Sequence, residues 1–198
     1  MIGIGSPSLG DAAMLGRAAL SAGCCNLLAL PPYYYRSASE DGLFGFFAAL
    51  IERIGDARAR LYLYNIPQQS GVAVTPALFA RLVKEFPGTV EGIKDAAGDW
   101  DLTARFLAEF PQQAIFSGPE RFLLANLRAG GPGCIAGGAN FLGPLLQRIH
   151  RSWNTPAADA MQAEVVAARD AIGKLSMIAA LKALTRRRSG DEAWRNLL

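Results

Sequence analysis

The stretch Leu61–Asp99, LYLYNIPQQSGVAVTPALFARLVKEFPGTVEGIKDAAGD, contains a complete β/α/β repeat. Short apolar runs at 61–65 and 90–94 are typical of buried strands, and apolar residues between 76 and 86 recur at helical spacing. The Thr-Pro pair at 75–76 marks the start of the helix, because a threonine oxygen caps the first turn and proline fits its first position. The repeat therefore predicts an α/β fold with parallel strands and covering helices.

The same alternation continues on both sides of this stretch. Further strands are expected at 2–5, 26–30, 114–117 and 133–136, and further helices at 11–22, 40–54, 100–109, 120–129 and 141–152. After about residue 155 only helices are expected, at 156–173 and 175–188. Six consecutive β/α units fit either an open doubly wound sheet or part of a (β/α)8 barrel. The first connection, GIGSPS at 3–8, lacks the GxGxxG motif, which weakens the dinucleotide-binding alternative.

Composition and charge exclude several classes of protein. The chain has 198 residues, of which 51% are apolar and 19% charged, and this describes a globular domain with a large core. The net charge is +3 with one dense basic run at 186–188, so no nucleic-acid partner is predicted. The longest apolar run, 43–51, is shorter than the roughly 18 residues that span a bilayer, and we expect no signal peptide, because no basic segment followed by an apolar one opens the sequence. We expect a cytoplasmic protein with no membrane partner.

The cysteines offer neither a disulfide framework nor a metal site. Cys24 and Cys25 are adjacent and Cys134 lies far along the chain, so no CxxC spacing occurs. No cluster of acidic residues and histidines has metal-ligand spacing either. The sequence therefore predicts no metal and no cofactor.

Lys94 is the strongest candidate for chemistry. It ends the strand expected at 90–94, and active sites of parallel α/β folds lie at the carboxyl ends of strands. A lysine held there among Ile and Ala side chains loses hydration, which favours the neutral amine that forms a Schiff base with a carbonyl. Gly92, on the same side of the strand, would leave its stem room to extend. The alternative is a lysine that extends from the strand end to solvent.

Tyrosines end the two preceding strands. Tyr64 in LYNIP comes thirty residues before Lys94, one β/α repeat away, so the two side chains are expected to be neighbours at the same rim. A phenol there can pass protons to and from a carbinolamine, although it can equally fill the core with its hydroxyl at the rim. Tyr33, Tyr34 and Tyr35 follow the strand before, and one of them is expected to supply a second hydroxyl.

Glycine-rich segments end the last two expected strands. They are FSGPE at 116–120, which contains Gly118, and GGPGCIAGGAN at 130–140, which contains Ile135. Backbone N–H groups there can approach a carboxylate or a phosphate. The same glycines also serve tight packing, so an open α/β phosphate-binding or regulatory module is only a third alternative.

Taken in order, PPYYY, LYNIP, GIKDAAGD, FSGPE and GGPGCIAGGAN resemble the dihydrodipicolinate synthase and N-acetylneuraminate lyase family of pyruvate-dependent class I aldolases. The resemblance runs from Met1 to about Arg188. It implies a TIM (β/α)8 barrel in which Lys94 forms the Schiff base with pyruvate. It also implies that Tyr64 shuttles protons and that Tyr34 reaches the active site of a neighbouring subunit, in a dimer or tetramer.

The resemblance also assigns substrate-binding positions. Ile135 matches the position whose backbone faces the bound keto acid, and Gly118 lies in the preceding glycine-containing motif. Gln69 stands where synthases that use aspartate semialdehyde carry an arginine that binds a carboxylate. A neutral amide cannot form the bidentate, charge-assisted pair of a guanidinium, which favours a keto-sugar-acid aldolase over a true dihydrodipicolinate synthase.

The chain departs from the family at its N-terminus. It opens on what resembles the third strand and lacks the Gly-Thr-Thr-Gly-Glu-like turn of the second, so units 3 to 8 are expected. We expect a partial barrel at 1–152 and a C-terminal helical extension at 153–198. The partners would be a small keto acid and an aldehyde. The alternative function is a truncated, non-catalytic remnant or pseudoenzyme, because two missing units expose sheet edges.

Overall fold

The computed structural model describes residues 1–173 and 175–195. The chain divides into two compact units, Met1–Phe116 and Ser117–Leu198. The expected boundary after residue 152, between a partial barrel and a helical extension, does not coincide with this division and stays a prediction.

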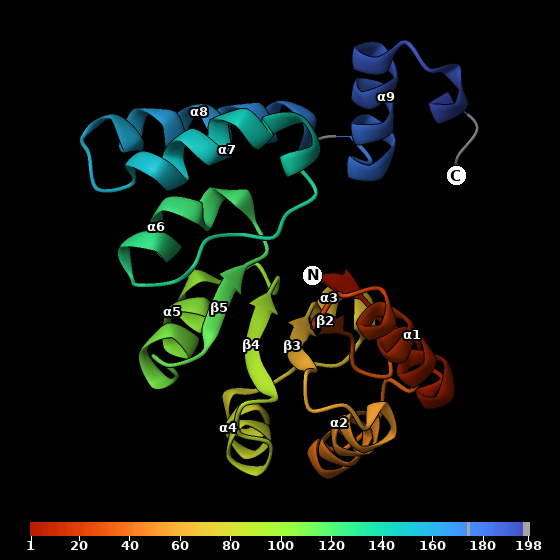
Figure 1. Ribbon diagram of the computed structural model, residues 1–198. Coiled ribbons are helices and arrows are strands. Elements are labelled where there is room, and N and C mark those ends of the chain that lie inside the picture. Colours follow the sequence, from red (N-terminus) through yellow and green to blue (C-terminus); the bar gives the residue numbers. More distant parts are fainter. Residues whose placement is uncertain (174, 196–198) are drawn as a thin grey trace. The chain divides into compact units, whose positions relative to one another are not determined.

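The first unit is a parallel sheet with helices around it (Figure 1). Its strands are β1 Ile2–Gly3, β2 Asn26–Ala29, β3 Arg60–Asn65, β4 Val90–Asp95 and β5 Ala114–Ser117, in the order β1-β2-β3-β4-β5. Its helices are α1 Leu9–Ser21, α2 Glu40–Ile54, α3 Pro67–Ser70, α4 Pro76–Glu85 and α5 Trp100–Glu109. β1 to β4 pair in parallel, as the β/α repeats predict. Helix α3, in the loop after β3, was not predicted.

Period-two alternation explains the two faces of the sheet. In β3, Leu61, Leu63 and Asn65 are buried beneath the helices, while Tyr62 and Tyr64 are half-buried on the opposite face. The helix-side core is apolar and aromatic, with the Phe79 ring packed edge-on against those of two phenylalanines of the next repeat. The face that carries Tyr62 and Tyr64 is therefore the one available for chemistry.

Predicted helix ends are confirmed by side-chain contacts. Ser39 Oγ accepts a hydrogen bond from the N–H of Gly42, and Thr75 Oγ1 accepts one from the N–H of Leu78. Gly55 closes α2 in the left-handed conformation, with φ of 62°. These caps place the helices that flank β3.

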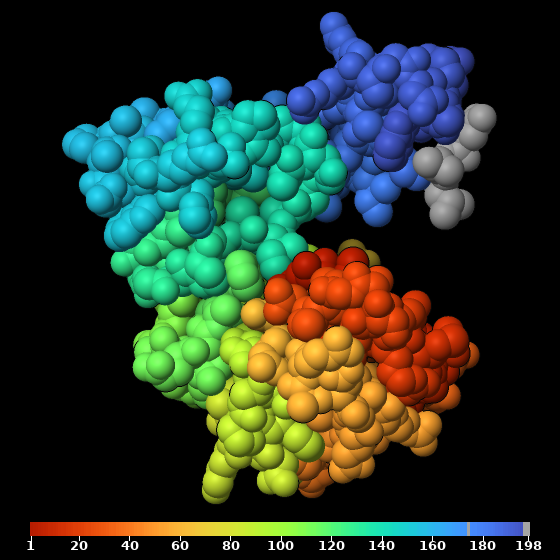
Figure 2. Space-filling model, in the orientation of Figure 1, coloured from red at the N-terminus to blue at the C-terminus, as the bar shows by residue number. Residues whose placement is uncertain are grey.

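Helices α1 and α2 pack closely, and Figure 2 shows their surfaces in contact. A Cβ atom on Gly16 would lie 2.9 Å from Ile54 Cδ1, so any larger residue would require the Ile54 side chain to shift. Arg17 Nη1 also donates to the carbonyl oxygen of Arg53 over 2.7 Å. The small residue thus lets the two helices approach each other closely.

The second unit is helical. It contains the 3-10 turn η1 Glu120–Phe122, helices α6 Leu123–Arg128, α7 Ala139–Ser152, α8 Ala157–Gly173 and α9 Met177–Ser189, and the turn η2 Glu192–Arg195. Leucines of α6 and α7 and apolar residues of α8 form its core. α8 and α9 confirm the two expected C-terminal helices.

The strand expected at 133–136 does not form. This segment makes one isolated parallel bridge, between Ser117 and Cys134, with a hydrogen bond from the Ile135 N–H to the Ser117 carbonyl oxygen. Pro132 removes a ladder donor and Gly133 has φ of 125°, so the extended stretch cannot grow into a strand. The described residues 1–173 and 175–195 therefore contain five strands where six were expected.

No helix within 1–173 or 175–195 is long and apolar enough to cross a membrane.

Asp56 supplies a testable charge effect in the loop before β3. Its carboxylate accepts hydrogen bonds from the Arg58 side chain and backbone N–H, which lower its pKa to about 2. A carboxyl with a lowered pKa stabilises the fold above its ordinary pKa, and this contribution is lost as the pH falls through about 2. NMR titration should show the pKa of Asp56 rising part of the way to 3.8 in Arg58→Ala, because residue 58 keeps its backbone N–H. An unchanged Asp56 titration would contradict the assignment.

Candidate active site

Tyr64 and Lys94 lie side by side, as predicted. They are register partners on β3 and β4, at the carboxyl ends of the two strands. Lys94 Nζ lies over the Tyr64 ring, 3.8 Å from its centroid. A cation–π contact of this kind holds the amine at the rim of the sheet instead of leaving it extended in solvent.

A cavity of about 320 Å³ opens beside Tyr64. It is lined by Leu30, Tyr33, Tyr64, Ile66, Gln69 and Ser70. Its volume suits a small organic molecule, and these lining residues carry no charge. Tyr64 therefore both lines the cavity and carries the Lys94 amine on its ring.

The tyrosine cluster divides in two. Tyr33 lines the cavity, whereas Tyr34 is 76% exposed and packs its ring edge-on against Tyr35 at 5.4 Å. Within one chain the second phenol at the cavity is therefore Tyr33, whereas the prediction names Tyr34. The predicted role of Tyr34 in a neighbouring subunit stays a prediction.

The residues that follow Tyr64 and Lys94 form a buried polar cluster. Asn65 Nδ2 donates to Asp95 Oδ1 over 2.8 Å, and Thr103 Oγ1 donates to Asp95 Oδ2 over 2.6 Å. The Ala97 N–H also donates to Asp95 Oδ1, while Asn65 Oδ1 accepts from the Val74 N–H. The three side chains are at most 1% exposed. This cluster was missed, although it has the same thirty-residue spacing as the tyrosine and the lysine.

The short helix α3 fixes the cavity wall after β3. Pro67 occupies its first turn, and Gly71 ends it in the left-handed conformation with φ of 72°. Gln68 Nε2 donates to the Ala96 carbonyl oxygen over 2.6 Å, which ties this loop to the one after β4. Gln69 is thereby placed at the cavity.

Gly118 and Ile135 belong to the second unit, and their predicted roles in substrate binding stay predictions. The glycine-rich segment around Ile135 uses its backbone donors within the chain. The Gly133 N–H donates to Asn126 Oδ1 over 2.8 Å and the Gly138 N–H to Glu120 Oε1 over 2.6 Å. Two of the backbone donors on which a phosphate-binding module would depend are therefore bonded within the chain.

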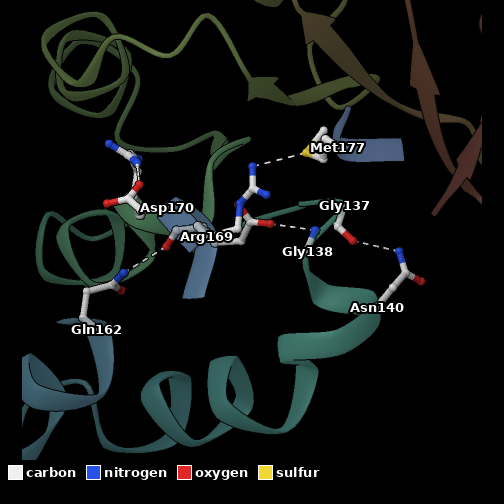
Figure 3. Close-up of polar contacts among 9 residues, drawn as sticks. Gly137, Gly138, Asn140, Gln162, Arg169, Asp170 and Met177 are labelled. Atoms are coloured by element: carbon white, nitrogen blue, oxygen red, sulfur yellow. Dashed lines mark hydrogen bonds and ion pairs between the residues drawn. The ribbon is translucent and has the colours of Figure 1, made fainter. Parts of the chain in front are cut away.

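Glu120 is the centre of a second polar cluster, of which Figure 3 labels Gly138, Gln162 and Arg169. Its carboxylate is paired with Arg169 Nε at 3.2 Å, and Arg169 Nη2 lies 3.2 Å from Met177 Sδ. Gln162 Nε2 donates to the Glu120 carbonyl oxygen. These contacts hold α8 against η1 and the start of α7. Across the described residues, no group of three or more His, Cys, Asp or Glu side chains is arranged to hold a metal ion.

Comparison with known proteins gives the family. The model of the dihydrodipicolinate synthetase family matches residues 1–189. An uncharacterized DapA-like lyase of Chloroflexus aurantiacus is 32% identical over 185 residues, covering 91% of this chain and 60% of the relative. The 4-hydroxy-tetrahydrodipicolinate synthase of Methanopyrus kandleri is 34% identical over 154 residues, covering 77% of this chain and 50% of the relative.

Comparison with solved structures gives the same family as comparison of sequences. The crystal structure of dihydrodipicolinate synthase from Agrobacterium tumefaciens aligns with a TM-score of 0.85 and 35% identity, covering 99% of this chain and 66% of that chain. The chain thus spans 50 to 60% of the length of these curated relatives. Its five-stranded parallel sheet corresponds to part of the TIM-barrel fold of those enzymes. With residues 1–189 matched, this chain belongs to the dihydrodipicolinate synthetase family.

Proposed function

We propose that this protein is a carbon–carbon lyase or synthase that performs Schiff-base aldol chemistry on pyruvate or a related 2-keto acid. The proposal rests on one observation. Lys94 Nζ lies 3.8 Å from the centroid of the Tyr64 ring, and Tyr64 lines a cavity. A phenol that lines the cavity and an amine on the ring of that phenol are the two groups that this reaction requires.

The chemistry assigns a step to each group. The neutral Lys94 amine attacks the keto carbon, and the resulting carbinolamine loses water to give an iminium. Loss of a proton from the adjacent carbon gives an enamine, which adds to an aldehyde, and cleavage runs the same steps in reverse. Tyr64 delivers a proton to the departing hydroxyl and takes one back, with Tyr33 in the same cavity and Tyr34 from a neighbouring copy as assisting phenols.

The residues that line the cavity indicate which class of aldehyde the enzyme would accept. Gln69 is an amide donor and acceptor, and its neighbours Leu30 and Ile66 are apolar. Such a wall can hydrogen-bond a hydroxyl group but cannot neutralise a carboxylate. We therefore infer that the aldehyde is a neutral, hydroxylated one, as in cleavage of a keto-sugar acid, and that aspartate semialdehyde is a poor partner.

Trapping with borohydride tests the proposal. The chain is incubated with pyruvate, reduced, digested and analysed by mass spectrometry. The reduced adduct is expected on Lys94, and Lys84, Lys174 and Lys182, the other lysines of the chain, serve as internal controls. An adduct spread evenly over all lysines, or none on a demonstrably folded chain, would overturn the proposal and favour a non-catalytic member of the family.

Removal of one hydroxyl tests the role of Tyr64. Tyr64→Phe keeps the ring beneath the Lys94 amine but removes the proton donor. Positioned acid–base groups contribute about 10² to 10⁴ in rate, so adduct formation should slow by about 10²-fold or more. Tyr35→Phe is the matched control, because its parent side chain is 63% exposed and does not line the cavity. Equal trapping rates in the two variants would exclude Tyr64 as the proton carrier.

A further inference from the structure

We propose that the buried cluster Asn65–Asp95–Thr103, called the clamp below, positions the Lys94 amine over the Tyr64 ring. The inference rests on the proposed function for its chemical meaning, but the geometry that it explains is independent of any substrate. The clamp residues touch neither the cavity nor the amine, so their role is positioning.

The position of the clamp in the register carries the argument. Asn65 and Asp95 are the residues directly after Tyr64 and Lys94, and they pair with each other in the β3–β4 register as those two do. Successive side chains point to opposite faces of a strand, so the clamp lies beneath the helices while the amine and the phenol lie on the other face. A bond across one face therefore fixes the separation of the two strand ends on the other.

All three hydrogen bonds to Asp95 within and next to the clamp are donated to its carboxylate. Asp95 accepts from the Asn65 amide, the Thr103 hydroxyl and the Ala97 N–H, so three donors surround one buried carboxylate. Charge-assisted hydrogen bonds are about twice as strong as neutral ones, and in a buried site they leave few alternative arrangements. Asn65 Oδ1 in turn accepts from the Val74 N–H, which ties the strand end to the segment that precedes α4.

The neighbouring register shows why a clamp is needed at this point. The β3–β4 pairing has a shift between Leu61 and Tyr62, so regular ladder bonds alone do not fix the pairing along the whole length of the two strands. The Ala96 N–H donates to the Asn65 carbonyl oxygen over 2.7 Å, beyond the last paired residues. The clamp and this bond together fix the strand ends after the irregularity.

The experiment varies only the hydroxyl donor of α5. Thr103→Val has nearly the same shape but cannot donate to Asp95, Thr103→Cys has a weak donor, and Thr103→Ser keeps the hydroxyl. The first readout is the upfield NMR shift that the Tyr64 ring imposes on the ε-methylene protons of Lys94. The expected order of this shift is wild type and Thr103→Ser, then Thr103→Cys, then Thr103→Val, in which most of it is lost.

The rate of borohydride trapping is the second readout. A misplaced reactive group loses rate steeply, so Thr103→Val should form the Lys94 adduct about tenfold more slowly, with Thr103→Ser restoring the rate. Thr75→Val is the matched control. Thr75 Oγ1 accepts from the Leu78 N–H and donates to Glu40 Oε2 over 2.7 Å, so it bonds none of the three clamp side chains, although the Val74 N–H beside it donates to Asn65. This variant should lose stability and keep both readouts.

The outcomes separate the two claims. Loss of the Lys94 shift in Thr103→Val or, if that variant does not fold, a reduced shift in Thr103→Cys supports the clamp, whether or not wild type traps pyruvate. An unchanged shift in the folded Val or Cys variant overturns the clamp. Failure of wild type to trap pyruvate, with the graded shift intact, overturns the proposed function alone.

Discussion

Gly92→Ala should destabilise the first unit by about 3 kcal/mol, the upper part of the range for overpacking a core. A Cβ atom at this position would collide with the backbone carbonyl oxygen of Ala114 and lie 2.9 Å from Tyr62 Cδ1. A backbone carbonyl in the adjacent strand cannot rotate away, so β4 and β5 would have to separate. Chemical denaturation monitored by circular dichroism measures the loss.

Gly3→Ala is the control for that change. It also replaces a strand glycine, but no atom lies within 4 Å of its would-be Cβ. Its unfolding free energy should stay within about 0.5 kcal/mol of wild type. Equal losses of unfolding free energy in the two variants would show that replacing any strand glycine is costly, and that the close approach of β5 to Gly92 is not the cause. In that case the room that Gly92 leaves for the Lys94 stem would be its main role.

The sequence predicted best where one local rule decides. Strand periodicity, the Ser39 and Thr75 caps and the Gly55 helix end follow from short-range chemistry, and the structure confirms each of them. Tyr64 and Lys94 were predicted as neighbours because equivalent strand ends one repeat apart share a rim, and their register pairing confirms this.

Prediction failed where long-range geometry decides. Tyr33 and Tyr34 lie in an irregular loop after two prolines, where alternation gives no rule for which ring enters the cavity. The buried Asp95 depends on side-chain donors from β3 and α5, which only the tertiary fold brings to it. The missing sixth strand shows the converse, since glycine and proline in the segment outweighed its apolar Ile135.

Glu120→Ala should cost the second unit about 3 kcal/mol, the usual loss when one member of a buried ion pair is removed. The side chains of Glu120 and Arg169 are only 5% and 20% exposed, and Arg169 Nη1 is buried with no hydrogen-bond partner among the described residues. Without the carboxylate, the guanidinium loses its counter-charge and the Gly138 N–H loses its acceptor. Thermal unfolding of the whole chain, followed by the far-ultraviolet signal, measures the effect.

The residues that directly follow Glu120 and Arg169 supply the control. Arg121 and Asp170 form a shorter ion pair, at 2.8 Å, but their side chains are 49% and 62% exposed. Exposed pairs are screened by water and contribute about 0 to 1 kcal/mol, so Asp170→Ala should change stability little. If distance set the strength, the shorter pair would matter more. We expect the reverse, because at Glu120 the loss comes from leaving a buried guanidinium and a buried N–H without partners, and water supplies partners to Arg121 at once.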